Sequence, residues 1–154
     1  YVVENEMVFC YLLEHAEEEI KKRPVSVNKP NNKNLTLLCT SGQFRTIALE
    51  LVPLILNSGS EIYYSGDIDP DGIRIADRLW QKFGNGIHIW RMSPEDYDIS
   101  ISKEYIDNNG LVKLENIQHP LLKQTAENVK GKKRAAYQEN LLKELLDDIC
   151  HSFK

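Results

Sequence analysis

Short apolar runs alternate with longer stretches of helical period over the first 90 residues of the chain. The apolar runs have the length and the polar or glycine-rich borders of buried strands, and they lie at residues 1–3, 35–39, 61–65 and 87–90. The stretches between them repeat apolar residues at the spacing of amphipathic helices, at residues 5–23, 44–57 and 73–83. This alternation predicts an α/β fold, with a parallel sheet of about four strands and helices on both faces.

Local signals mark the ends of these elements. Asn5 is a typical N-cap residue, so the first helix is predicted to begin just after it. Pro53 falls inside the second helix and predicts a kink or a division there. Residues 23–34 contain two prolines and four asparagines, which predicts a loop.

The pattern weakens after residue 90. Residues 91–118 look irregular, apart from a short helix expected near residues 103–108. Pro120 suits the first turn of a helix to about residue 129, and residues 132–152 predict a strong amphipathic helix. We therefore expect one domain over residues 1–154, with an α/β core at 1–90 and an irregular segment plus C-terminal helices at 91–154.

The charge balance restricts the partners of the chain. Its formal net charge is −4, so the domain as a whole has no basic field for nucleic acid. Contact with a DNA backbone would need a local patch, and the densest basic cluster is Lys130, Lys132, Lys133 and Arg134. A solvated helix start is the alternative explanation for this cluster, and the more common one.

The apolar runs and the cysteines predict a cytoplasmic protein outside the membrane. No apolar run approaches the roughly 20 residues that a membrane span requires. Cys10, Cys39 and Cys150 lie in apolar runs without metal-ligand spacing, which indicates buried free thiols in a reducing compartment. Because Tyr1 already lies in an apparent strand, we expect the chain to be the C-terminal part of a longer protein whose other domains are its partners.

Three aspartates crowd the turn between the third strand and the third helix. The run from Gly66 to Gly72 contains Asp67, Asp69 and Asp71. Carboxylates this close repel one another unless a cation or hydrogen bonds hold them. Asp67 and Asp69 are two residues apart, so an extended backbone projects both to one side, where they suit a hard metal ion or its waters. A plain turn with a helix cap is the alternative, since Asp, Pro and Gly are common in turns.

Polar residues at three strand ends are expected to meet at one edge of the sheet. Glu4 follows the first strand, residues 40–42 (Thr-Ser-Gly) follow the second, and Asp67 and Asp69 follow the third. In open parallel sheets, ligands bind at the carboxyl ends of the strands. Glu4 and the aspartate pair are therefore expected to be neighbours, although more than 60 residues separate them.

A glutamate after the first strand together with Asp-x-Asp after a later strand resembles the Toprim domain of topoisomerases, primases and several nucleases. The closer resemblance is to the type IIB topoisomerase A subunit and its meiotic double-strand-break relatives. Residues 2–4 are similar to that family's first motif, residues 41–44 to its glycine turn, and residues 67–72 to its Asp-x-Asp-Pro-x-Gly segment. The chain also resembles the nuclease subunit of the Wadjet plasmid-defence system and some uncharacterised bacterial C-terminal domains. The resemblance covers about residues 1–90.

This resemblance implies a Mg²⁺ site, with Mn²⁺ as a substitute, in a protein that cleaves or processes DNA phosphodiesters. Glu4, Asp67 and Asp69 match the family's acidic residues, and Glu4 matches its general acid/base. Asp71 has no fixed role in the family and is either a water-mediated metal ligand or a cap of the third helix. DNA would be contacted through the full-length protein.

Departures from the family keep other functions open. Asn5 stands where the topoisomerase relatives carry lysine, and the turn at residues 40–43 is less basic than theirs. Their DNA-attacking tyrosine lies in a separate winged-helix domain and has no match here, so this chain alone is not expected to act as a topoisomerase. One alternative is a non-catalytic Toprim scaffold that binds nucleic acid or a partner protein. Another is a nucleotide-binding domain with a phosphate site at Ser41 and Gly42.

Overall fold

The four apolar runs form a parallel sheet, as the alternation predicts. The fold is seen in a computed structural model that describes residues 1–21, 36–41 and 44–151, so the loop predicted at residues 23–34 lies outside it. The strands are β1 (Val2–Val3), β2 (Leu38–Cys39), β3 (Ile62–Ser65) and β4 (Ile87–Ile89), in the order β2-β1-β3-β4. Val3 pairs with Cys39 on one side and Ser65 on the other, so these three strands end at the same level.

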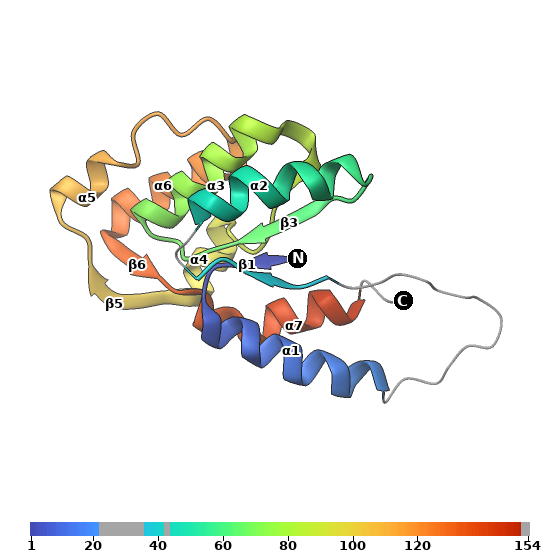
Figure 1. The fold of residues 1–154 in the computed structure, drawn as a ribbon. Helices are drawn as coiled ribbons and strands as arrows, with labels where there is room; N and C mark the ends of the chain where they lie inside the picture. Colours follow the sequence, from blue (N-terminus) through green and yellow to red (C-terminus); the bar gives the residue numbers. More distant parts are fainter. Residues whose placement is uncertain (22–35, 42–43, 152–154) are drawn as a thin grey trace.

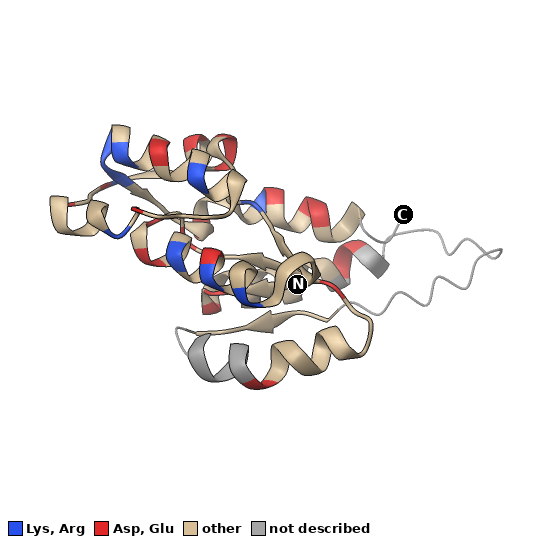
Figure 2. Ribbon diagram, turned by 90° about the horizontal axis from the view of Figure 1, so that it is seen from above, with Lys and Arg blue, Asp and Glu red and all other residues tan. Residues whose placement is uncertain are grey.

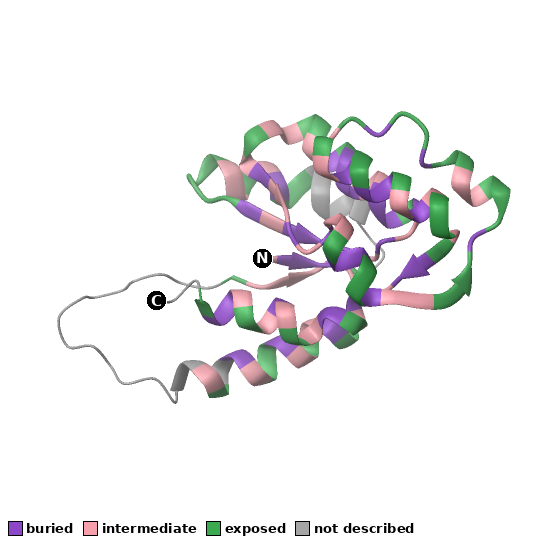
Figure 3. Cartoon of the chain, turned by 180° about the vertical axis from the view of Figure 1, so that it is seen from behind, coloured by how far each residue is buried: buried purple, intermediate pink, exposed green. Residues whose placement is uncertain are grey.

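Helices cover both faces of this sheet (Figure 1). On one face lie α2 (Phe44–Asn57) and α3 (Pro70–Phe83), and on the other α1 (Glu6–Lys21) and α7 (Leu142–His151). Alternation along β1 sends Val2 into the core beside α2 and α3, and Val3 into the core beside α1 and α7. Both valines are buried, and Figure 3 shows buried residues along the strands and the inner sides of the helices. A strand buried on both faces is typical of a covered parallel sheet.

Local signals account for the ends of the first helices. Asn5 Oδ1 accepts the backbone N–H of Met7 at 2.8 Å and that of Val8 at 3.3 Å, which confirms the predicted N-cap of α1. Pro53 lies within α2 without dividing it, because the helix continues from Phe44 to Asn57. The missing proline N–H removes one hydrogen bond from the helix and leaves the others in place.

The C-terminal third differs from the prediction. Its elements are η1 (Gly84–Gly86), α4 (Pro94–Ser100), β5 (Ile101–Tyr105), α5 (Asn108–Val112), α6 (Pro120–Lys132), β6 (Arg134–Ala136) and η2 (Gln138–Leu141), followed by α7. The short helix expected near residues 103–108 is wrong, because residues 101–105 form a strand. The single helix expected over residues 132–152 is also wrong, since α6, β6, η2 and α7 divide that segment.

Strand pairing explains both errors. β6 pairs with β5 in antiparallel fashion, with Ala136 opposite Ile101 and Arg134 opposite Tyr105. Lys133 adopts a left-handed conformation with φ 54° and donates its N–H to the carbonyl of Val129, which ends α6. The pairing of distant segments therefore outweighs the helical period of the local sequence.

The cysteines are less buried than the sequence predicts. None of the three forms a disulfide among the described residues, but only Cys150 is buried, whereas Cys39 is half-buried and Cys10 is exposed. The expected burial is therefore wrong for Cys10. Among the described residues, no helix has both the length and the apolar character needed to cross a membrane.

A carboxylate on α7 joins that helix to the end of β4. Asp148 Oδ2 accepts the indole N–H of Trp90 at 2.8 Å and Nε–H of Arg91 at 2.6 Å, while its Oδ1 accepts Nη2–H of Arg91 at 2.6 Å. Burial raises the pKa of Asp148, but the hydrogen bonds from Arg91 and Trp90 outweigh it and the net pKa is lowered. The ionised carboxylate therefore stabilises the contact between α7 and the sheet.

We expect Asp148→Asn to lower the free energy of unfolding by about 1–3 kcal/mol at neutral pH, because the amide nitrogen cannot accept these hydrogen bonds. Asp147→Asn, at the exposed neighbouring position, is the matched control. Because the native pKa of Asp148 is lowered, its contribution is present above its unfolded pKa and is lost as the pH falls through the native value. Urea unfolding should show the difference at pH 7 and its decline below about pH 4. Equal midpoints for the two variants at pH 7 would contradict the role of Asp148.

Candidate functional site

Glu4 lies over the turn that joins β3 to α3. In the register of the sheet, the residue after Val3 is Glu4, and the residues after Cys39 and Ser65 are Thr40 and Gly66. Glu4 Oε2 lies 3.5 Å from the hydroxyl of Tyr64. A Cβ atom at Gly66 would come within 2.8 Å of the same oxygen, so glycine leaves room for the carboxylate. The structure thus brings Glu4 to the aspartate turn, across the neighbouring strand.

The aspartate turn is fixed by its central residue. Ile68 is 1% exposed and belongs to the core, while Asp67 and Asp69 on either side of it are only half-buried. Ile68 also exchanges two backbone hydrogen bonds with Ala136 of β6, at 2.8 and 3.1 Å. The extended backbone with Ile68 pointing inward leaves the two aspartates on the opposite side.

Asp69 and Asp71, at the start of α3, make different contacts. Asp69 is the N-cap of α3, and its Oδ1 accepts the N–H of Gly72 at 2.7 Å. A Cβ at Gly72 would lie 2.1 Å from the carbonyl oxygen of Asp67, so only glycine fits the turn. Asp71 is exposed and its Oδ2 accepts a hydrogen bond from Nζ of Lys113 at 2.6 Å. The helix cap is therefore Asp69, and Asp71 forms a surface ion pair.

Two carboxylates at this edge, Glu4 and Asp67, have raised pKa values. Burial raises the pKa of Glu4, and the charges of Asp67 and Asp69 raise it further, against the opposing hydrogen bonds of the Tyr64 hydroxyl and the Asp67 N–H. Burial also raises the pKa of Asp67 to about 6, with Glu139 adding more than Asp69 does. Among the described residues, none of the three predicted ligands has a lysine or arginine within ion-pair distance. Within the part of the chain that the structure describes, the negative charge of the site therefore has no basic side chain as a partner.

Several buried polar atoms around this edge lack hydrogen-bond partners. Within the part of the chain that the structure describes, five such side-chain atoms occur, and four of them are Thr40 Oγ1, Ser65 Oγ, Gln138 Nε2 and Glu139 Oε2. Thr40 follows β2 at the level of Glu4, and Ser65 ends β3 opposite Val3. The N–H of Gln138 donates to Asp67 Oδ1 at 2.9 Å, and Asn5 Nδ2 donates to Glu139 Oε1 at 2.6 Å. Four of the described polar atoms without a hydrogen-bond partner thus belong to residues next to the acidic residues or bonded to their neighbours.

The sequence gives no local signal for Gln138 and Glu139. Both residues fall in a stretch whose apolar period predicts a continuous helix. In the structure they belong to η2, which follows the β6 strand that is bonded to Ile68. The pairing of β6 with the aspartate turn brings Gln138 and Glu139 to Asp67. The periodicity of the sequence does not predict that pairing.

The donor set fits a hydrated Mg²⁺ better than a fully protein-enclosed ion. Within residues 1–21, 36–41 and 44–151, no three His, Cys, Asp or Glu side chains converge closely enough to hold one ion. Mg²⁺ is usually bound by one or two carboxylates and keeps several waters. Asp67 and Asp69 each use Oδ1 for a backbone N–H, which leaves Oδ2 for an ion or its waters. The carboxylate oxygens and the negative charge suit such an ion.

The predicted phosphate turn lies beside a carboxylate. Ser41 has a left-handed conformation with φ 44° and is exposed, and its hydroxyl donates a short hydrogen bond to Glu6 Oε1. Gly42, the other residue of that prediction, lies outside the described residues. A phosphate at Ser41 would have to displace or face the charge of Glu6.

The basic cluster spans the end of α6 and the start of β6. Lys130 pairs with Glu127 at 3.0 Å, and Lys132 pairs with Asp98 at 2.6 Å. Lys133 is the C-cap of α6, and Arg134 is exposed on β6. Figure 2 shows acidic and basic residues interspersed along the helices. The cluster is therefore not the start of a helix, and two of its four charges have acidic partners.

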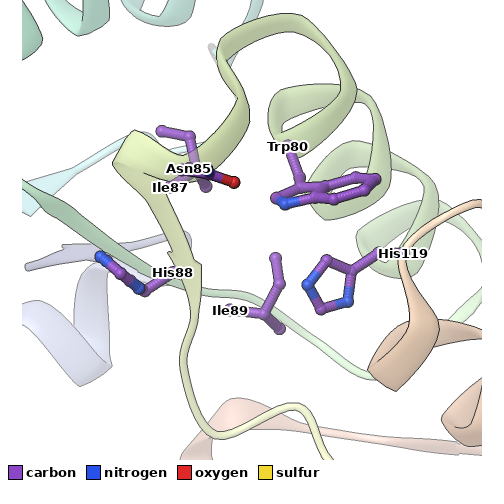
Figure 4. A pocket seen from close by; sticks show the side chains of 6 residues that line it. All are labelled: Trp80, Asn85, Ile87, His88, Ile89 and His119. Carbon is purple, nitrogen blue, oxygen red and sulfur yellow. The ribbon is translucent and has the colours of Figure 1, made fainter.

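A separate pocket of about 370 Å³ lies beside the edge strand β4 (Figure 4). It is lined by Trp80, Asn85, Ile87, His88, Ile89 and His119. The imidazole of His119 meets the indole of Trp80 edge to face, with ring centroids 4.8 Å apart. Asp77 is buried, and its Oδ1 accepts the N–H groups of Gln118 and His119, which fixes this wall. The pocket is built from β4, the end of α3 and the start of α6, and none of the predicted acidic residues lines it.

We expect Asp67→Asn to stabilise the fold when no divalent ion is present. The asparagine oxygen can still accept the N–H of Gln138, but the buried charge is removed. The native pKa of Asp67, about 6, lies above its unfolded value. The ionised carboxylate therefore destabilises the fold fully at a pH above the native pKa and not at all at a pH below the unfolded pKa. With partial exposure considered, the gain should be on the order of 1–2 kcal/mol at pH 7.5 and small near pH 4.

Urea unfolding in the presence of a chelator measures this difference. Asp71→Asn is the matched control, because it removes an exposed carboxylate from the same turn and should change stability by less than about 1 kcal/mol. A variant at Asp67 that is no more stable than wild type at pH 7.5 would show that this carboxylate carries no electrostatic penalty.

Comparison with known proteins identifies one relationship. A search of curated proteins and a search of solved structures each gave no match to the chain. A family model described as "Protein of unknown function C-terminus (DUF2399)" matches residues 1–149. Since the match extends over nearly all of the 154 residues, the chain belongs to the DUF2399 family.

Proposed function

We propose that the chain is a Toprim-like, Mg²⁺-binding domain of a protein that cleaves or processes DNA phosphodiesters. The observation that supports this most is the meeting of Glu4, from the end of β1, with Asp67 and Asp69, from the end of β3. These are the three positions that the resemblance to the Toprim domain assigns to acidic residues. The edge of a parallel sheet is also where ligands bind in open α/β folds.

The environments of Asp67, Asp69 and Glu4 favour different roles for these residues. Asp67 and Asp69 are held by backbone hydrogen bonds, so their Oδ2 atoms would face the cation in a fixed geometry. Burial raises the pKa of Glu4 above its ordinary value, which favours this carboxyl as the group that gives or takes a proton. A bound Mg²⁺ would neutralise charge that develops on a phosphate. Gly66 allows the carboxylate of Glu4 to approach the turn closely.

A non-catalytic module that binds nucleic acid or a partner protein is the second candidate. The position of Asn5 favours it, because the topoisomerase relatives carry lysine there. Asn5 uses Oδ1 to cap α1 and Nδ2 to bind Glu139, so it is fully engaged in structure. With a net charge of −4, the domain also lacks the positive field that would attract DNA from a distance.

Calorimetric titration of Mn²⁺ and Mg²⁺ tests the metal site. Wild type should bind, and the double variant Asp67→Asn/Asp69→Asn should bind at least about tenfold more weakly. Asparagine keeps the backbone hydrogen bonds of both positions, including the cap of α3, so the fold should persist. Glu115→Gln, at an exposed position in the C-terminal third, is the control. Equal heats for wild type and the double variant would contradict the site.

Cleavage of supercoiled plasmid separates the two candidate functions. If the domain is catalytic, Mg²⁺ or Mn²⁺ should support nicking, and Glu4→Gln should reduce the rate by about 10²–10⁴-fold at a saturating metal concentration. If the domain only binds, no divalent ion should support cleavage, and DNA binding should survive Glu4→Gln. Gel electrophoresis and fluorescence anisotropy measure the two outcomes on the same protein.

A further inference from the structure

The 3-10 helix η2 forms a wall of the acidic site. The antiparallel bridge between Ile68 and Ala136 fixes the start of this segment against the aspartate turn. Two residues later, the N–H of Gln138 donates to Asp67 Oδ1 at 2.9 Å. η2 is therefore bonded to the metal-ligand candidate itself and does not merely lie near it.

Gln138 presents a buried amide donor. The residue is only 1% exposed. Its Oε1 accepts the backbone N–H of Asn5 at an N···O distance of 3.4 Å, and this contact favours the amide orientation that places Nε2 on the other side. Nε2 then has no hydrogen-bond partner among the described residues. Gln138 thus contacts the junction after β1 through Asn5 and the junction after β3 through Asp67, so its unpartnered amide belongs to the same edge of the sheet as the acidic residues.

Glu139 presents the complementary group, a buried carboxylate oxygen. Asn5 Nδ2 donates to Glu139 Oε1 at 2.6 Å, and Asn5 is itself fixed by capping α1. The second oxygen, Oε2, is buried and accepts no hydrogen bond within the described part of the chain. Glu139 directly follows Gln138, whose N–H is bonded to Asp67, so both carboxylates belong to the segments joined by that hydrogen bond. A second carboxylate on the wall of the site suits a shared cation.

We propose that Gln138 and Glu139 complete the site by binding the two halves of a metal–phosphate unit. Glu139 Oε2 joins Asp67 in holding the cation or its waters, and Gln138 Nε2 donates to a non-bridging phosphate oxygen of the substrate. A neutral donor suits that position, because it contacts the phosphate without neutralising the carboxylates that bind the cation. The inference rests on the proposed function and adds to it two ligands from the C-terminal third.

Two probes separate the two roles. With Mn²⁺ alone, measured by calorimetry, Glu139→Gln should lower the affinity about tenfold or more, whereas Gln138→Met should leave it within about twofold. With a short DNA duplex at saturating Mn²⁺, measured by anisotropy, Gln138→Met should lower the affinity about tenfold. Glu115→Gln and Gln124→Met, both at exposed positions, are the matched controls. Gln138→Glu keeps the acceptor for Asn5 but removes the donor, so it provides a second variant should the methionine disturb the fold.

Each outcome decides the proposal. If wild type binds Mn²⁺ and the Asp67→Asn/Asp69→Asn variant does not, but Glu139→Gln binds as tightly as wild type, the role of Glu139 is overturned and the proposed function stands. If DNA affinity is the same in wild type and both Gln138 variants, or if wild type binds no DNA, the role of Gln138 is overturned. If wild type binds no Mn²⁺, the proposed metal site and this inference both fail.

Discussion

The pair of backbone hydrogen bonds between Ile68 and Ala136 connects the parallel sheet to the C-terminal part of the chain. Ile68 anchors the aspartate turn in the core, and Ala136 ends the strand that pairs with β5. Through this bridge the N–H of Gln138 reaches Asp67, and Glu139 reaches Asn5 at the start of α1. The acidic edge is consequently enclosed by segments from both halves of the sequence.

The same enclosure concentrates like charges in a partly desolvated space. Burial and mutual repulsion raise the pKa of Glu4 and Asp67, and the described residues offer these carboxylates no lysine or arginine at ion-pair distance. Elsewhere the fold compensates its acids more fully: Asp148 accepts hydrogen bonds from Trp90 and Arg91, and one oxygen of Asp77 accepts two backbone N–H groups. Asp67 and Asp69 each accept one backbone N–H, and that of Asp67 does not offset the effect of burial on its pKa.

How far the sequence predicts this structure depends on the range of the interactions. The α/β order, the parallel sheet and the cap at Asn5 follow from local apolar period and turn chemistry, and all three are confirmed. The position of Glu4 beside the aspartate turn follows from the topology of a parallel sheet, without any contact being known. The β5–β6 pair and η2 could not be predicted, because residues 134–141 lie in a stretch of helical period and are held as strand and 3-10 helix by partners distant in the sequence. The roles of Gln138 and Glu139 depend on that pairing and were missed with it.

The span of the site along the chain has a consequence for biosynthesis. Its groups come from Glu4 at one end and from residues 136–139 near the other, and the contacts between them close loops of more than 130 residues. Such distant closure is slow relative to local helix formation and occurs only after most of the sequence is available. When only the segment up to β4 has left the ribosome, Glu4, Asp67 and Asp69 lie on a fold that still lacks residues 136–139. Assembly of the charged centre is thereby postponed until translation of the domain is almost finished.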